Sequence, residues 1–216
     1  MRIIDIYNTY HLPERLRIHM LKVGACCKLI LDNFDDTPIN KKAIITVALL
    51  HDTGNMAKIG NIGNTNIDDI TLEDKEFINI RKKYIDKYGL DDNLITIEIG
   101  KELGLTDYEL KLFELKESKR NEEIMKSNNF EEKICAYCDE RVSPYGVMGI
   151  KERLEDAKKR YKGSKSIWGN EEEANHLIEC ALEIEKQIMK HCKIKPEDIN
   201  DNSIEKYIEE LKKYEI

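Results

Sequence analysis

The chain has 216 residues, of which 35 are Lys or Arg and 42 are Asp or Glu, so its formal net charge at pH 7 is −7. This acidic total argues against broad, sequence-independent binding to nucleic acid, and a hydrophobic fraction of 41% is that of a folded chain. There is no run of about 18 apolar residues, so we expect no membrane-spanning segment. The charged N-terminal stretch has no signal-peptide core, and the six cysteines are typical of reduced thiols, so we expect a cytoplasmic protein.

The predicted elements are helical from the start of the chain. Pro13 is tolerated in a first helical turn and predicts a helix over residues 13–33. Asn40 is an N-cap residue for a second helix, which is apolar nearly all round and therefore expected to be central and buried. This helix should end at His51-Asp52, with Gly54 placed to terminate it.

The rest of the chain continues the helical pattern after an irregular Gly- and Asn-containing stretch at residues 53–71. Further helices are predicted at residues 72–88, 92–103, 106–126, 129–143, 151–161, 170–192 and from 203 onward. No segment shows a convincing period-2 pattern, so we predict no strand. We therefore expect an all-α fold, with residues 1–165 as the main body and residues 166–216 as a C-terminal helical hairpin packed on it.

Three of these helices place a residue that can bind a metal on a face expected to be buried. His19 lies in the apolar stripe of the first helix, His51 and Asp52 end the second, and Asp139 lies on the apolar face of the helix at 129–143. A buried carboxylate is costly unless it is paired or bound to a metal. One divalent ion, such as Mn, Fe, Co, Ni or Zn, would satisfy all four residues. Because neighbouring side chains on a helix point about 100° apart, His51 and Asp52 can share an ion only where their helix ends.

The order His19, then His51-Asp52 after a buried apolar helix, then Asp139 within KICAYCDERVSPYGV, resembles the ligand set of the HD-domain metal-dependent phosphohydrolases. The resemblance covers about residues 10–150. It implies an HD-domain-like helical bundle with the metal at its centre, and hydrolysis of a phosphate ester, often in a nucleotide. It further implies that Asp52 helps to orient the attacking water.

Two departures from the family pattern narrow these expectations. Many binuclear members carry extra histidines after the His-Asp pair, whereas this chain has none between His51 and His176, so we expect one metal rather than two. The 5′-deoxynucleotidases of the family carry a glutamate near the position of Asn55, and an amide cannot act as a general acid or base. The general acid is therefore unassigned.

Two basic residues are candidates for binding substrate. Arg15 lies one helical turn before His19 on the same face, and Lys58 lies in the loop just after the ligand pair. For each of them a solvated surface position is the alternative. Cys135 and Cys138 are expected to be core residues, because no second cysteine pair completes a zinc site.

Three hypotheses about function remain. The first is a phosphohydrolase acting on a small phosphorylated molecule such as a nucleotide. The second is a catalytically weak or inactive module that binds a metal or a nucleotide for regulation, which the amide of Asn55 favours. The third is a helical interaction protein whose long C-terminal helix mediates formation of a homodimer.

Overall fold

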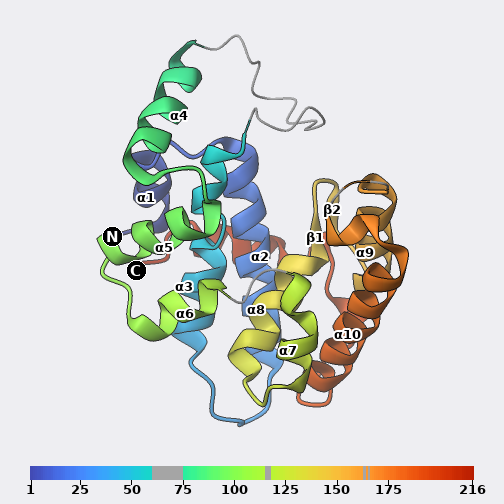
Figure 1. The fold of residues 1–216 in the computed structure, drawn as a ribbon. Helices are drawn as coiled ribbons and strands as arrows, with labels where there is room; N and C mark the ends of the chain where they lie inside the picture. The colour runs from blue at the N-terminus through green and yellow to red at the C-terminus, as the bar shows by residue number, and fades with distance from the viewer. Residues whose placement is uncertain (60–74, 115–117, 163, 165) are drawn as a thin grey trace.

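The computed structural model describes residues 1–59, 75–114, 118–162, 164 and 166–216. This part of the chain contains eleven α-helices and one two-stranded antiparallel hairpin, which confirms the predicted all-α class (Figure 1). The helices are α1 Ile3–Thr9, α2 Glu14–Asn33, α3 Lys41–Leu50, α4 Lys75–Tyr88, α5 Asp92–Glu102, α6 Asp107–Glu114, α7 Asn121–Lys126, α8 Phe130–Arg141, α9 Ile150–Arg160, α10 Glu171–Met189 and α11 Asp201–Leu211. The 3₁₀ turns are η1 Thr53–Ala57, η2 Ser118–Arg120, η3 Ile167–Gly169 and η4 Pro196–Asp198. None of the described helices is long and apolar enough to cross a membrane.

Asparagine side chains at N-cap positions start several of these helices. Asn40, Asn129 and Asn170 each accept a hydrogen bond from the backbone N–H three residues on, which satisfies a donor that a helix start leaves unpaired. Thr106 and Glu109 form a capping box, because each side chain accepts a hydrogen bond from the backbone N–H of the other residue. The starts of α3, α6, α8 and α10 are therefore determined locally.

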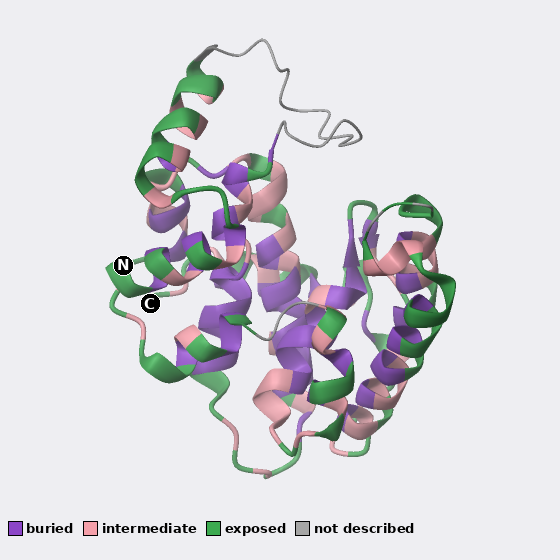
Figure 2. Cartoon of the chain, in the orientation of Figure 1, coloured by how far each residue is buried: buried purple, intermediate pink, exposed green. Residues whose placement is uncertain are grey.

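The core is built around α3, whose residues from Ala43 to Leu50 are all buried. It packs against α2, α6 and α8, and the buried faces of these helices point inward in Figure 2. The outer side of α2 is covered by α11, where Leu211 approaches Gly24. Buried residues beyond position 165, such as Ile184 and Ile204, belong to the same hydrophobic cluster as α3. The core therefore runs across the predicted boundary at residue 165, and the division into two parts stays a prediction.

The structure differs from the predicted elements in three places. An unpredicted helix, α1, precedes the expected first helix and buries Ile3, Ile6 and Tyr7. Seven residues are too few for a stable isolated helix, so α1 depends on tertiary contacts such as the hydrogen bond from the Tyr7 hydroxyl to the Leu49 carbonyl, 2.7 Å long.

The predicted helix at 106–126 is divided into α6, η2 and α7, and residues 115–117 lie outside the described part. The Arg120 guanidinium donates to the carbonyl of Glu114, which compensates for a helical bond lost at the end of α6. The third difference is the hairpin of β1 Val142–Ser143 and β2 Gly146–Val147, in which Gly146 has a φ of 133° that suits only glycine. Of the predicted helix at 72–88, the described part begins at residue 75.

Candidate metal centre

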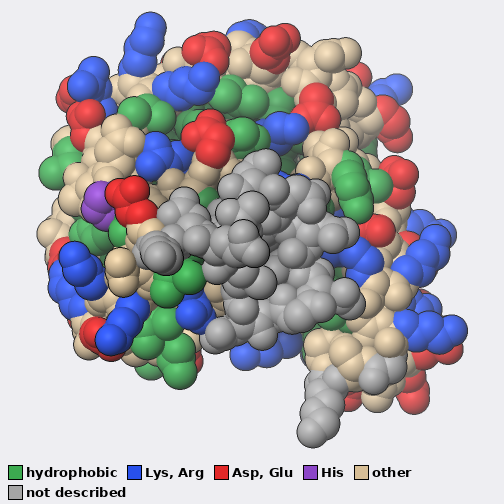
Figure 3. All heavy atoms as spheres, turned by 90° about the horizontal axis from the view of Figure 1, so that it is seen from above, with side chains coloured by type: hydrophobic (Ala, Val, Ile, Leu, Met, Phe, Trp, Pro, Cys, Tyr) green, Lys and Arg blue, Asp and Glu red, His purple; other side chains and the backbone are tan. Residues whose placement is uncertain are grey.

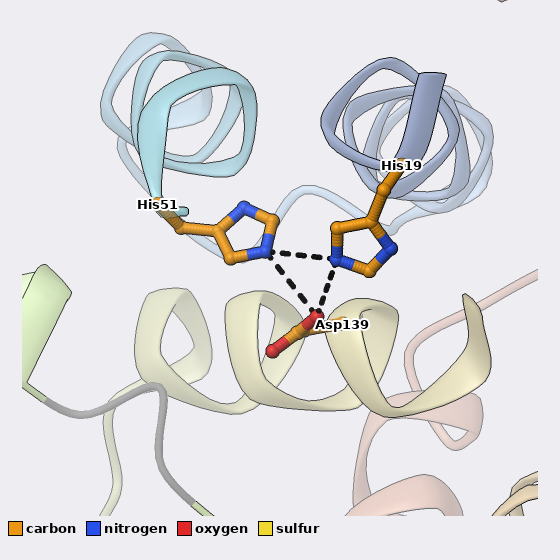
Figure 4. Close-up of side chains that lie close together, drawn as sticks. All are labelled: His19, His51 and Asp139. Atoms are coloured by element: carbon orange, nitrogen blue, oxygen red, sulfur yellow. Dashed lines mark hydrogen bonds and ion pairs between the residues drawn. The ribbon is translucent and has the colours of Figure 1, made fainter. Parts of the chain in front are cut away.

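Three helices bring His19, His51 and Asp139 together (Figure 4). His19 comes from α2, His51 follows the last residue of α3, and Asp139 comes from α8. The Nε2 atoms of the two histidines are 3.2 Å apart. The Oδ1 atom of Asp139 is 3.1 Å from Nε2 of His19 and 3.3 Å from Nε2 of His51. One ligand atom from each of three separate helices therefore faces a common point.

The carboxylate of Asp52 lies at the edge of the same cluster. Its Oδ2 atom is 3.6 Å from Nε2 of His19 and 3.7 Å from Nε2 of His51. The helix α3 ends at Leu50, and Asp52 has φ −111° and ψ 14°, outside the helical values. This turn of the backbone places two side chains that are adjacent in sequence on one side of the chain.

The ring of His51 is fixed by its other nitrogen. Its Nδ1 atom is 2.8 Å from the carbonyl oxygen of Ala48, to which it donates a hydrogen bond, so the neutral ring carries its lone pair on Nε2. Only 3% of the His51 side chain is exposed, whereas 25% of each of the side chains of His19 and Asp139 is exposed. The cluster is therefore anchored on the His51 side and accessible on the other.

The spacing of the ligand atoms suits a divalent ion. Bonds of about 2.0–2.2 Å from a metal to nitrogen and oxygen put neighbouring ligand atoms roughly 3–3.5 Å apart. The three separations in the cluster, 3.1, 3.2 and 3.3 Å, match this range. A single N–H on Nε2 of His19 cannot serve both His51 and Asp139, so lone pairs are left facing each other. A cation at their common point would remove this repulsion, and two carboxylates with two neutral imidazoles would balance its charge.

The two neighbouring carboxylates of α8 have different environments. Burial acts to raise the pKa of Asp139, but the charge and hydrogen bonds that His51 and His19 supply in their protonated forms outweigh it and hold this pKa well below its usual range. Burial raises the pKa of Glu140 to about 7, even though Asn121 donates to its carboxylate over 2.9 Å. Asp139 is therefore the ionised, ligand-ready group, whereas Glu140 is paired with α7.

Gly54 does not terminate the helix as predicted. It lies within η1, four residues after Leu50, the last residue of α3, and its φ is not positive. A Cβ atom at this position would lie 2.0 Å from the backbone oxygen of Asp92 and 2.8 Å from Oγ1 of Thr96. The glycine is required because the start of α5 lies directly against η1, and its N–H donates to the hydroxyl of Thr96 over 3.1 Å.

Thr96 is a positioning residue that the sequence did not single out. Its hydroxyl donates toward the carbonyl of Asp92, 2.8 Å away, and lies 3.3 Å from the carbonyl of His51. It therefore connects α5 to the backbone of the ligand pair. The only available signal was a threonine between Ile95 and Ile99 in an otherwise apolar helical face, which sequence reasoning does not separate from ordinary core positions.

The predicted substrate-binding residues occupy less distinctive positions. Arg15 lies half-buried in the first turn of α2, one turn before His19. The ammonium group of Lys58 is 2.7 Å from Oδ2 of Asp92, and 51% of its side chain is exposed. A substrate-binding role for either residue stays a prediction. Cys135 and Cys138 are buried free thiols, and burial raises the pKa of each, as expected of core residues.

The charge around one end of the bundle is mixed. On the described part of the face in Figure 3, Lys and Arg side chains lie among Asp and Glu side chains. Such a face lacks the single-sign field that tracks a nucleic-acid backbone.

Comparisons of the chain with protein-family models, with curated proteins and with solved structures find no match. The chemistry assigned to the centre therefore rests on its own geometry.

Proposed function

We propose that the protein is a phosphohydrolase that depends on one divalent ion, such as Mn, Fe, Co, Ni or Zn. His19, His51, Asp52 and Asp139 would hold the ion, and the substrate would be a phosphate ester such as that of a nucleotide. The observation that carries the proposal is the convergence of ligand atoms from three helices at separations of 3.1–3.3 Å. The order of these residues, which resembles that of the HD-domain phosphohydrolases, supports the choice of reaction.

The protein groups around the proposed ion have distinct tasks. A bound divalent ion lowers the pKa of a coordinated water and polarises a phosphoryl oxygen. The Ala48 carbonyl holds the proton of neutral His51 on Nδ1, so its Nε2 lone pair would face the ion beside the carboxylate of Asp139. We assign Asp52 to orienting the attacking water, because its carboxylate reaches the edge of the cluster without lying as close as that of Asp139.

A second candidate function is a module that binds a metal or a nucleotide without turnover. Asn55 supports it, because this residue lies in η1 and its backbone N–H donates to the carbonyl of Asp52 over 2.9 Å. The side chain next to the ligand pair is thus an amide, which supplies no proton to a leaving group. Such a module would be stabilised by its ligand and would release no product.

Elemental analysis of protein purified without a histidine tag tests the metal centre. We expect about one transition-metal ion per chain in the wild type and a large loss of it in His51→Ala. His191→Ala is the matched control, because His191 is paired with Asp35 over 2.7 Å and takes no part in the cluster. Absence of bound metal after incubation with each of the five ions would refute both metal-dependent functions.

A panel of phosphate esters then separates the two candidates. The metal-loaded wild type should release phosphate from at least one nucleotide, and His51→Ala and Asp139→Ala should lose this activity by several orders of magnitude. A metal-loaded protein that is thermally stabilised by nucleotides and hydrolyses none of them is the regulatory module instead.

A further inference from the structure

The proposed centre, with its ion, carries no net positive charge to neutralise a phosphate group. Two carboxylates and two neutral imidazoles carry two negative charges, which one divalent ion cancels. A phosphate monoester carries close to two negative charges near neutral pH. A substrate of this kind therefore needs a cation that is not itself a metal ligand, placed close to Asp139 or the histidines.

Several cations of the described part of the chain are already engaged. Lys58 is paired with Asp92. The guanidinium of Arg17 donates to Asn8 and to the backbone carbonyls of Tyr7 and Leu12. Each of these groups would have to give up a partner before it could bind a substrate anion.

Arg153 is differently placed. It lies half-buried on α9, and its Nε donates to the carbonyl of Val142, 3.4 Å away, in the segment that directly follows α8. Burial lowers the pKa of Arg153, and the nearby guanidinium of Arg160 acts in the same direction, while the negative charges of Asp139, Asp156 and Glu140 oppose them. Val142 is the third residue after Asp139, and α9 packs against α8, so the hydrogen bond to Val142 places the guanidinium beside the end of α8 that carries the ligand carboxylate.

The terminal nitrogens of Arg153 have unused hydrogen-bonding capacity. Within the described ranges, no carboxylate lies within 4.0 Å of its guanidinium, and Nε makes its only hydrogen bond. Arg160, on the same face of α9, differs because its Nε is 2.8 Å from Oδ2 of Asp156. A half-buried guanidinium without an ion-pair partner is costly, and an incoming anion would repay that cost.

We propose that Arg153 is a substrate-binding residue of the same centre, and that both of its terminal nitrogens donate hydrogen bonds to the phosphate of a monoester. This inference rests on the proposed function. Because Nε is held by Val142, the two terminal N–H groups are left to form a bidentate pair with two phosphate oxygens. A monoester has three non-bridging oxygens, enough for one on the metal and two on Arg153. A diester has only two, so the arrangement selects monoesters.

Binding of inorganic phosphate to the metal-loaded protein tests this assignment without relying on turnover. Arg153→Gln should weaken phosphate binding in isothermal titration calorimetry by about tenfold to a hundredfold, the range expected for a lost charge-assisted pair. Arg153→Lys keeps the positive charge but loses the pair of terminal N–H groups, and should weaken phosphate binding by a smaller factor of at least threefold. Lys151→Gln is the matched control, because it removes one positive charge from an exposed position of α9, and should bind phosphate like the wild type.

The metal content of each variant, measured by elemental analysis, distinguishes a failure of the role of Arg153 from a failure of the proposed phosphohydrolase function. If Arg153→Gln keeps its metal and melting temperature and binds phosphate within threefold of the wild type, the role of Arg153 is refuted and the phosphohydrolase stands. If the wild type binds no metal, the proposed function fails and this inference fails with it. Should Arg153→Gln not fold, Arg153→Lys decides the question by the same threefold criterion.

Selectivity is tested with p-nitrophenyl phosphate and bis(p-nitrophenyl) phosphate. Arg153→Gln should lower kcat/KM for the monoester at least tenfold more than for the diester. Equal losses on the two substrates would overturn the assignment of a monoester.

Discussion

Replacement of Gly54 by alanine adds a single methyl group where η1 and α5 approach closely, near the candidate metal centre. The new Cβ would lie 2.0 Å from the backbone oxygen of Asp92, whereas ordinary contacts begin at 3.4 Å. The difference, 3.4 − 2.0 = 1.4 Å, is the distance by which η1 and α5 must separate. Rotation of a side chain cannot relieve this clash, because the nearest atom is the backbone oxygen of Asp92.

The cost of Gly54→Ala follows from two contributions. Forcing a methyl group into a packed site costs about 1–3 kcal/mol. Separation of η1 from α5 also breaks the 3.1 Å hydrogen bond from Gly54 to Thr96, which contributes about 1 kcal/mol. The sum, roughly 2–4 kcal/mol, corresponds to a fall in Tm of about 5–15 °C for a chain of this size.

Thermal unfolding and metal titration of Gly54→Ala should both respond. The ligand pair immediately precedes η1, so a shift of η1 should also weaken metal binding. Gly149→Ala is the matched control: its φ is −61°, nothing lies within 4 Å of the added Cβ, and a neutral result or a gain of about 0.5 kcal/mol is expected. If Gly54→Ala melts within 2 °C of the wild type and binds metal equally well, the close packing of η1 on α5 is not what makes this residue a glycine.

Three further outcomes follow from the same contacts. Thr96→Val should lower the free energy of unfolding, measured with urea, by about 1–3 kcal/mol, because the Gly54 N–H loses its buried acceptor, and Thr96→Ser should restore most of it. Arg141→Met should cost about 3–5 kcal/mol in the same assay, since it removes the ion-pair partner of Glu185 and the donor to the carbonyls of Met148, Pro196 and Ile199, and a loss below 1 kcal/mol would contradict this. Chelation of the metal should lower the Tm of the wild type and leave that of His51→Ala unchanged, with a stabilisation of about 2.7 kcal/mol at a metal concentration 100 times Kd.

The elements that could be predicted from the sequence are those determined by residues close together in the chain. Asn40, Asn129 and Asn170 mark helix starts because a short polar side chain reaches its own backbone. The helix α1 was not predicted, because its seven residues are held by contacts such as that of Tyr7 with Leu49, which is 42 positions away. A contact at that separation leaves no local pattern.

The same distinction applies to the candidate site. His19, His51 and Asp139 stood out because each interrupts an apolar helical face, and the structure brings the three together. Thr96 and Arg153 do not depart from the pattern of their helices, since threonine is common on buried helical faces and arginine is common in charged helices. Gly54 was noticed, but its cause, the backbone of Asp92, lies outside the reach of any local rule.

The buried guanidinium of Arg141 joins the end of α8 to the segment around η4. It follows Asp139 on α8 and donates to the carbonyls of Met148, Pro196 and Ile199. The order of the loop near η4 is therefore coupled to the helix that carries a proposed metal ligand. The C-terminal residues should not melt ahead of the centre, and calorimetry should record one cooperative transition in which the centre and the end of the chain unfold together.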